Sequence, residues 1–509
     1  MNIYQRVAQH ALLTPNKIAV TYQKQTLTYL QLIEKVDNLS SNLFRLGFHQ
    51  QSKVALFCGN NIEFVLTLLA IAKLGAAVAP LPLTLKGQAL TNALKGIGCD
   101  RVIAWSTVGK QILSKQLIEK SCLVSLDKQV TDEVLFSDLL SASSTEQLPI
   151  VDCDNDYILT LTSGSTGNPK PIVFSQTTKI NRAFQATINY YQLTADDVVL
   201  VATPLYHSLA QRSLLMPLML GACVVILPKF TINGWLHALT EHKVSFLFAV
   251  SSQLTALLPE LENNHGFRAL KCLVSSSATL AKEDKAKLLN KLSCHFHECY
   301  GASEVGVVTD FDITALNQPV ASVGKPLPFV DVKICNTQRE ILKEGEIGEI
   351  ACKTSTAFKG YYGLAEQTAA SFDQQGYFYT GDLGYLDAQG YLYFVGRTKE
   401  VIKSGGINVY PNDVEKVMSR VEGIKECAAI AMEDNQFGEV IWLCYVLESH
   451  VNEFDEKKLA RQAMAELIDY QLPRKYLHFE QFPKSALGKI LKPEIKKQLQ
   501  AMSNTNGYK

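Results

Sequence analysis

Apolar residues follow two alternating patterns over the first four hundred positions of the chain. Short continuous apolar runs, such as Val54–Cys58, Tyr157–Leu161 and Val198–Ala202, have the length of buried strands. Between them, apolar residues recur every three or four positions, as in residues 32–46, which is the spacing of an amphipathic helix. Continuous apolar strands alternating with helices are typical of parallel sheets covered on both faces. The pattern therefore predicts an α/β fold.

Two predicted helices carry boundary signals. Thr28 and Gln31 have the spacing of a capping box ahead of the apolar-periodic segment that ends near residue 46. Asn61–Leu74 forms a second helical segment, and Gly75 is suited to end it.

The pattern changes near Arg397. Glycine and tyrosine become dense over residues 360–406, where we expect short antiparallel strands. The predicted elements after that point are a helix from Pro411 to about Arg420, strands at Cys427–Met432 and Ile441–Leu447, and a helix from about Asp455 to Leu467. We therefore expect a boundary at Arg397–Lys399, between a large domain of residues 1–397 and a smaller α+β domain of residues 398–509.

Composition narrows the class of protein. Of 509 residues, 47% are apolar and 19% charged, as expected of a folded chain with two or three domains. The net charge is zero, so no basic excess indicates nucleic acid or an anionic membrane. The longest apolar stretches, Val65–Leu83 and Leu214–Pro228, are interrupted by Lys73 or by prolines, so we expect no membrane span. The twelve cysteines form no CxxC pair and no secretory signal is evident, which favours reduced thiols in a cytoplasm.

A segment rich in serine, threonine and glycine follows the run Tyr157–Leu161. It consists of Thr162, Ser163, Gly164, Ser165, Thr166, Gly167, Asn168, Pro169 and Lys170. Glycines let backbone N–H groups turn toward an anion, hydroxyls add donors and the lysine adds charge, so the segment has the composition of a phosphate-binding loop. It is not a Walker A loop, because Lys170 stands between two prolines. Taken alone, it is equally well a polar surface turn.

Other candidate groups lie at predicted strand ends and loops. Tyr300, Gly301 and Glu304 combine an aromatic ring, room for close approach and a carboxylate able to hold Mg²⁺, although an ordinary strand-end turn has the same composition. Asp382 lies in a similar turn. Lys489 lies on a glycine-bearing loop, where a solvated surface charge is the simpler interpretation.

Together these segments resemble the adenylate-forming superfamily, which includes acyl-CoA synthetases, peptide-synthetase adenylation domains and beetle luciferases. The resemblance covers nearly the whole chain and extends to Pro204–His207, Gly348–Ile350 and Gly360–Tyr362. It implies a large N-terminal domain of parallel β-sheets covered by helices with a small β-barrel-like part, and a smaller, mobile α+β C-terminal domain.

The resemblance also implies a site for ATP and Mg²⁺ in the large domain. Residues Thr162–Lys170 would hold the β- and γ-phosphates, with Thr162 and Glu304 at the metal and Lys170 as a catalytic charge. The implied adenine site consists of Tyr300, Gly301, Ala302 and Ser303, with Ser276, Ser277 and Ala278 on the other side of the base. His207 would lie where the acyl pocket meets the thiol channel; a buried, hydrogen-bonded core histidine is the alternative.

The remaining implied roles fall near and after the boundary. Asp382 and Arg397 would bind ribose, and Lys399 would be the hinge of the small domain. Gly405 and Gly406 would line the channel for the pantetheine thiol of coenzyme A. Lys489 would bridge the substrate carboxylate and the α-phosphate.

The chain departs from the family's usual pattern at three places. Pro171 stands where glycine is usual, Ser303 replaces threonine, and Ser275–Thr279 replaces a Ser-Gly-Gly-Ala-Pro segment. None of these changes removes a catalytic group, so the resemblance implies an active enzyme.

The segment around His207 narrows the class of possible substrates. Amino-acid-activating relatives usually carry an aspartate there, whereas Pro204–Ala210 contains no acid, which favours a carboxylic acid without an α-amino group. Fatty and aryl acids both remain open. We expect coenzyme A as the acceptor, with an acyl carrier protein as the alternative, and a catalytically idle nucleotide-binding protein as a less favoured hypothesis.

Overall fold

The computed structural model describes the chain except for residues 130–132, 142–145, 147, 163–169, 264–266, 277–279, 281, 315–320, 452, 486–487 and 506–509. The chain divides into two compact units. Unit 1 contains Met1–Val320, Pro326–Asp331 and Lys353–Phe378, and unit 2 contains Ala321–Lys325, Val332–Cys352 and Tyr379–Lys509.

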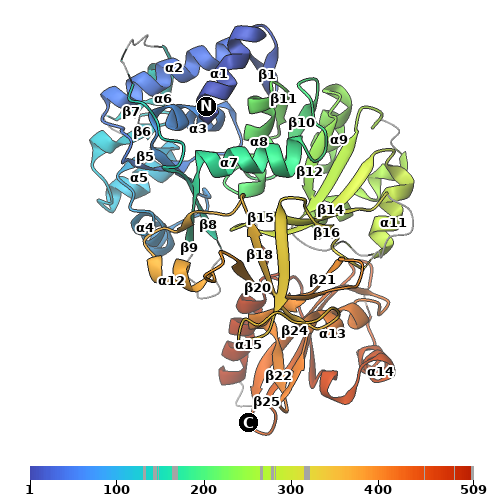
Figure 1. Ribbon diagram of the computed structural model, residues 1–509. Coiled ribbons are helices and arrows are strands. Elements are labelled where there is room, and N and C mark those ends of the chain that lie inside the picture. The colour runs from blue at the N-terminus through green and yellow to red at the C-terminus, as the bar shows by residue number, and fades with distance from the viewer. Residues whose placement is uncertain are drawn as a thin grey trace. The chain divides into compact units, whose positions relative to one another are not determined.

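Unit 1 contains two large sheets (Figure 1). One has the strand order β2 (Gln25–Thr28), β1 (Ile18–Tyr22), β11 (Cys223–Ile226), β10 (Val198–Val201), β12 (Phe246–Val250), β13 (Cys272–Ser276), β14 (His295–Ala302) and β15 (Gly306–Asp312). All of these pairings are parallel except β1 with β2 and β14 with β15.

The second sheet of unit 1 has eight strands. Their order is β19 (Gly360–Tyr361), β9 (Lys170–Ser175), β8 (Asp156–Thr162), β4 (Ala77–Pro80), β3 (Lys53–Phe57), β5 (Arg101–Ala104), β6 (Leu123–Ser125) and β7 (Val134–Leu135). The strands from β8 to β7 are parallel, whereas β9 is antiparallel to both of its neighbours. The predicted parallel α/β architecture is confirmed.

Helices connect and cover these strands. They are α1 (Ile3–Leu13), α2 (Tyr29–Arg45), α3 (Ile62–Leu74), α4 (Gly87–Gly96), α5 (Ser106–Ser114), α6 (Phe136–Ser141), α7 (Gln176–Ala183), α8 (Ser208–Leu220), α9 (Ile232–Glu241), α10 (Ser251–Leu257), α11 (Lys282–Lys291) and α12 (Ala365–Ala370). A π-helical turn, η2 (Phe184–Ile188), extends α7. The capping box of Thr28 and Gln31 is present, and Gly75 ends α3 with a φ of 72°. Both predicted helix boundaries are confirmed.

Unit 2 contains a four-stranded sheet and a five-stranded sheet. The first has the order β17 (Val330–Cys335), β18 (Gly348–Thr354), β20 (Phe378–Leu386) and β21 (Leu392–Arg397). The second has the order β23 (Ile407–Val409), β22 (Ile402–Ser404), β25 (Gly438–Leu447) and β24 (Ile424–Asp434), with β26 (Lys475–His478) beside β25. The helices are α13 (Pro411–Met418), α14 (Lys457–Glu466) and α15 (Lys492–Thr505).

Two apolar clusters cover the five-stranded sheet. One joins alternate residues of β24 and β25 to α13 and α14, and the other joins the intervening residues to α15. This is the α+β arrangement expected for the C-terminal region. The four-stranded sheet corresponds to the small β part expected within the N-terminal domain, but by its contacts it belongs mostly to unit 2. The expected boundary at Arg397–Lys399 and the expected hinge at Lys399 stay predictions.

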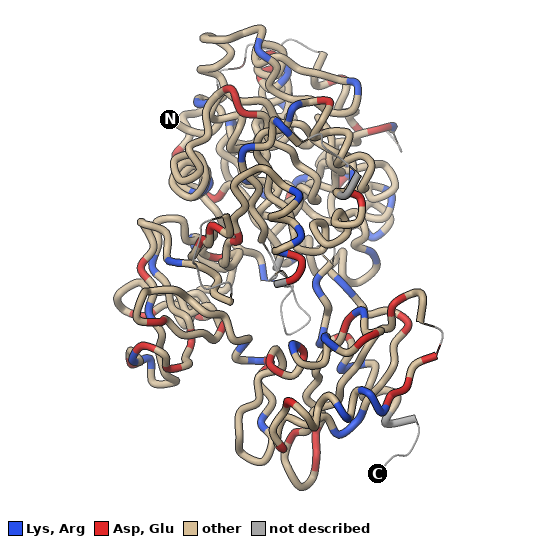
Figure 2. The backbone as a smooth tube through the Cα atoms, turned by 90° about the vertical axis from the view of Figure 1, so that its right-hand side faces the viewer, with Lys and Arg blue, Asp and Glu red and all other residues tan. Residues whose placement is uncertain are grey.

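The described helices include none that is both long and apolar enough to cross a bilayer. All twelve cysteines are free thiols. Figure 2 shows lysine and arginine residues interspersed with aspartate and glutamate residues along the backbone of both units.

Candidate functional site

Glu304 is the carboxylate that the sequence analysis singles out in unit 1. Its side chain accepts a hydrogen bond of 3.1 Å from the hydroxyl of Tyr361, which lies on β19. The Nζ atom of Lys170, at the start of β9, lies 4.9 Å from the centroid of the Tyr361 ring. Burial and the neighbouring carboxylate raise the pKa of Tyr361, so this phenol remains a donor. The fold thus brings Lys170 and Glu304, far apart in sequence, to the same tyrosine.

The backbone at Glu304 is fixed by Arg182 of α7. The carbonyl oxygens of Ser303 and Glu304 accept hydrogen bonds of 3.1 and 2.8 Å from Arg182 Nη2, and the Phe358 amide also donates to the Glu304 carbonyl, at 2.7 Å. Arg182 Nε donates to the carbonyl of Thr356 at 2.8 Å. One buried guanidinium therefore holds the turn that presents Glu304.

Gly301 is required by close approach of two strands. A Cβ atom at this position would lie 1.9 Å from the carbonyl oxygen of Gly306 on β15, and the strand register shifts between Tyr300 and Gly301. No side chain fits there. Tyr300 and Ala302, on either side, lie on β14 as expected, and Ser303 follows that strand.

His207 immediately precedes α8. Its Nε2 atom is buried and has no hydrogen-bond partner within the described part of the chain, and the ring centroid lies 4.4 Å from that of Tyr206. Burial lowers the pKa of His207 to about 4, so the imidazole is neutral near pH 7. The alternative was a core histidine held by hydrogen bonds. The structure shows no such hydrogen bond at Nε2 among the described residues.

Three basic side chains near His207 were missed by the sequence analysis: Lys179 and Arg182 are buried, and Arg212 is partly buried. Lys179 and Arg182 lie on α7, and Arg212 lies on α8. Burial lowers the pKa of Lys179, and the charges of Arg182 and Arg212 lower it further; burial and the charge of Arg212 likewise lower the pKa of Arg182. Only Arg212 carried a signal, as a single charge within the largely apolar segment Ser208–Leu220; Lys179 and Arg182 lie in the polar segment Gln176–Ala183.

In unit 2, Asp382 and Arg397 are direct partners across β20 and β21. The Arg397 Nε atom lies 3.2 Å from Asp382 Oδ1, and the aspartate is nearly covered. Burial, together with the charge of Arg397, lowers the pKa of Lys489. The structure therefore brings three predicted site residues into one electrostatic neighbourhood.

Gly405 and Gly406 form the two-residue turn between β22 and β23. Their φ values are 58° and 82°, and Ser404 pairs with Ile407 on either side of the turn. Positive φ at both positions is the geometry of a type I′ turn, which glycine adopts readily. A Cβ atom on Gly406 would meet nothing within 4 Å. Lys399 lies in the short 3₁₀ turn of residues Thr398–Glu400.

Part of the predicted phosphate loop and adenine site lies outside the described residues. This applies to Ser163, Gly164, Ser165, Thr166, Gly167, Ser277 and Ala278. Thr162 ends β8, where its backbone is paired with Lys170, but its side chain is not among those described. Ser276 ends β13 and contacts the thiol of Cys299.

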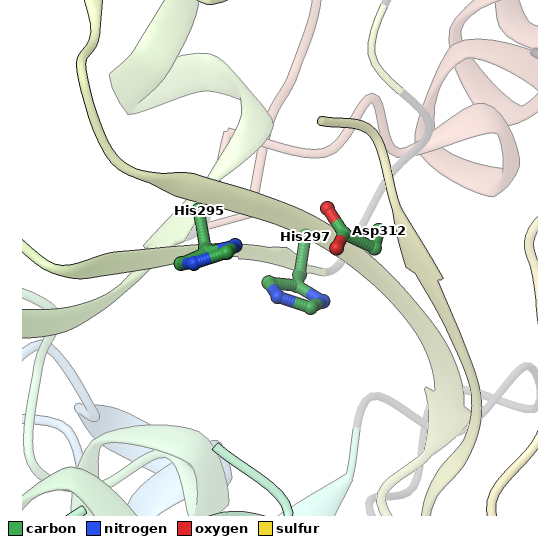
Figure 3. A group of neighbouring side chains, drawn as sticks. All are labelled: His295, His297 and Asp312. Atoms are coloured by element: carbon green, nitrogen blue, oxygen red, sulfur yellow. The ribbon is translucent and has the colours of Figure 1, made fainter. Parts of the chain in front are cut away.

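A separate cluster lies on the antiparallel pair β14–β15. His295, His297 and Asp312 each offer one atom that could bind a metal ion, and these three atoms lie within 4.8 Å of one another (Figure 3). His297 Nδ1 already lies 2.7 Å from Asp310, and Asp312 accepts a hydrogen bond from the Thr314 amide. The sequence analysis did not single out this cluster.

The fold and the site agree with the class of adenylate-forming enzymes: parallel sheets, a lysine and a carboxylate that share Tyr361 as a neighbour, and a separate α+β region. Residues 7–362 match the family described as AMP-binding enzyme, and residues 413–489 match the AMP-binding enzyme C-terminal domain. The chain belongs to the AMP-binding enzyme family. The predicted resemblance to the adenylate-forming superfamily, and with it the prediction of an enzyme, is confirmed.

Known relatives match over almost their whole length. The indoleacetate–CoA ligase of Aromatoleum aromaticum is 27% identical, with 97% of this chain and 98% of the relative covered. A 2-succinylbenzoate–CoA ligase of Bacillus mycoides is 26% identical with the same coverage. The crystal structure of ATP-bound MatB from Rhodopseudomonas palustris superposes with a TM-score of 0.88 at 23% identity, over 99% of this chain and 100% of that one.

Proposed function

We propose that this chain is an AMP-forming acid–coenzyme A ligase. It would convert a carboxylic acid and ATP to an acyl-adenylate and pyrophosphate, and then transfer the acyl group to the thiol of coenzyme A. The observation that carries the proposal is the joint placement of Lys170 and Glu304 at Tyr361, within the segment that matches the family. The full-length relatives described above, both named CoA ligases, support the acceptor.

In the first step, a carboxylate oxygen attacks the α-phosphorus of ATP and pyrophosphate leaves. This step needs positioning and stabilisation of negative charge on the departing group. We assign Lys170 and the segment from Thr162 to the phosphates, and Lys489 to the α-phosphate and the substrate carboxylate. Tyr300, Ser303 and Ser276 would contact the adenosine, and Asp382 and Arg397 the ribose.

The Mg²⁺ ion that accompanies ATP requires oxygen ligands. The Glu304 carboxylate is of the right chemistry, and its hydrogen bond from Tyr361 orients it without removing its remaining lone pairs. Thr162 is the second proposed ligand. The ion would neutralise the charge that builds up on the phosphates.

In the second step, the thiol attacks the acyl carbon and AMP leaves. We assign Gly405 and Gly406 to the thiol channel, because their turn carries no side chain. His207 would lie beside the reacting carbon, where burial keeps its imidazole neutral near pH 7. A rotation about Lys399 would let one small domain, residues 398–509, serve both steps.

The substrate is an acid without an α-amino group. Pro204–Ala210 contains no carboxylate, and the guanidinium of Arg182 donates a hydrogen bond of 3.3 Å to the Ser208 hydroxyl within it. An ammonium group there would be buried without a partner, which costs several kcal/mol. A carrier protein as acceptor finds no support in the names of the relatives described above.

The direct test is ATP–pyrophosphate exchange with a panel of carboxylic acids, followed by addition of coenzyme A. The proposal expects exchange that depends on an acid, and formation of the acyl-CoA with AMP once coenzyme A is added. Exchange followed by transfer only to a carrier protein would contradict the assigned acceptor.

A further inference from the structure

We infer that Arg212 is an anion receptor for the acyl group, and that the enzyme's substrate is a dicarboxylic acid. One carboxylate would be activated by ATP, and the second would be held by the Arg212 guanidinium. This inference rests on the proposed ligase function and names the substrate class of the same site.

Arg212 differs from Lys179 and Arg182 in its hydrogen bonds. Lys179 donates to Gln211 at 2.8 Å, and Arg182 donates to three carbonyl oxygens and to Ser208 Oγ. The Nη1 atom of Arg212 is buried and has no hydrogen-bond partner among the described residues. Its guanidinium lies 4.8 Å from the centroid of the Phe248 ring, and no acid of the described chain forms an ion pair with it.

The local charge is also unbalanced. Arg182 and Arg212 repel one another, and Glu304 acts on Arg182, whereas no carboxylate is among the groups that act on Arg212. Burying a charge without a counter-charge is costly. An incoming anion would supply the missing partner. The guanidinium fork matches the two oxygens of a carboxylate.

The position of Arg212 connects it to the reacting groups. It lies on α8, the helix that His207 precedes, and it acts electrostatically on Tyr191 and on Cys299, the residue before Tyr300. Residues 206–209 and Arg212 all keep part of their surface accessible, whereas the rest of α8 is largely covered. An acid activated next to His207 and Tyr300 would therefore extend its far end along the residues that surround Arg212.

The test compares matched substrates in wild-type enzyme and Arg212→Met. Each pair consists of a dicarboxylic acid and its monoamide of the same length, in aliphatic and aryl series, assayed by acid-dependent pyrophosphate exchange. The wild type should prefer the diacid in kcat/KM, and Arg212→Met should lower the ratio of diacid to monoamide by roughly 10- to 100-fold, mostly through KM. Arg212→Lys should retain part of the preference, because it keeps the charge without the fork.

Arg6→Met is the matched control. Arg6 also stacks on an aromatic ring, Phe184 at 5.1 Å, and has a buried Nε without a hydrogen-bond partner among the described residues, but it lies on α1. This variant should leave the ratio unchanged. The melting temperature gives a second readout: Arg212→Met should change it little, because the variant loses the contact with the Phe248 ring but also removes the buried, unpartnered Nη1 atom.

The outcomes separate the two proposals. Preference of the wild type for monoamides, or a ratio that Arg212→Met does not change, would overturn the diacid assignment while leaving the ligase intact. A large fall in the melting temperature of Arg212→Met with an unchanged ratio would show a structural role instead. Absence of exchange with every acid would overturn the ligase function itself.

Discussion

The Tyr361 hydroxyl donates a hydrogen bond of 3.1 Å to the Glu304 carboxylate. Tyr361 belongs to β19 in one sheet of unit 1, and Glu304 lies in the turn between β14 and β15 of the other sheet. The contact therefore connects the two sheets at the carboxylate that we assign to Mg²⁺.

Tyr361→Phe should raise the Mg²⁺ concentration needed for pyrophosphate exchange and slow the exchange roughly 10-fold, because loss of one hydrogen bond frees the Glu304 side chain. A Mg²⁺ titration of the exchange rate measures this. Tyr362→Phe is the control, since Tyr362 lies beside Lys53 and Gly98 and not at Glu304. If both substitutions had the same effect, the hydrogen bond from Tyr361 to Glu304 would have no specific role in Mg²⁺ binding.

Lys489→Ala should slow adenylate formation by roughly 10² to 10³ and spare thioester formation from supplied acyl-AMP, because the charge is needed while pyrophosphate leaves. Separate assays of the two half-reactions check this. Lys484→Ala removes a lysine of the same segment that pairs with Glu426, and should affect neither step. Equal losses in both half-reactions of Lys489→Ala would contradict the assignment.

The pH dependence of adenylation should follow Lys489. Burial and the charge of Arg397 lower its pKa from 10.5. The proposed role at the α-phosphate requires the protonated form. Adenylation that depends on Lys489 is therefore present at low pH and lost as pH rises through the lowered pKa. We expect the adenylation rate of the wild type to fall at alkaline pH, below pH 10.5, and the residual rate of Lys489→Ala to lack this fall. The same fall in both proteins would exclude Lys489 as its cause.

Gly406→Leu should block thioester formation while adenylation continues, so that acyl-AMP accumulates on the enzyme. The side chain has room in this structure but strains a backbone with a φ of 82°, at a cost of about 1 kcal/mol. Gly390→Leu is the control, because Gly390 has a φ of 78° and equally open space in the loop between β20 and β21. Quenched-flow measurement of bound acyl-AMP distinguishes the two, and normal thioester turnover in Gly406→Leu would rule out a channel at this turn.

His207 should make the protein sensitive to acid. The unfolded histidine takes up a proton near pH 6.5, whereas the folded residue does so only near pH 4. Stability from the neutral buried ring is thus present above pH 6.5 and is lost as pH falls toward 4. Between pH 7.5 and 5.0, the melting temperature of His207→Gln should fall less than that of the wild type. His450→Gln, which alters an exposed imidazole, should behave like the wild type.

Local signals in the sequence were sufficient to predict much of the fold. The boundaries of α3 follow from Asn61 and Gly75, because capping depends on residues next to the helix ends. The pairing of Glu304 with Tyr361 and the grouping of Arg212 with Lys179 depend on contacts between segments distant along the chain, which local patterns do not encode. For the same reason, the association of residues 332–352 with the C-terminal unit was not anticipated.

The most direct test of the central claim is the product balance of one reaction. The protein is incubated with ATP, Mg²⁺ and coenzyme A, and with each carboxylic acid or its α-amino analogue, and the products are quantified by mass spectrometry. The account predicts AMP, pyrophosphate and acyl-CoA in equal amounts, with simple acids and not with their amino analogues. Formation of ADP and phosphate, preference for amino acids, or AMP release without acyl-CoA would contradict it.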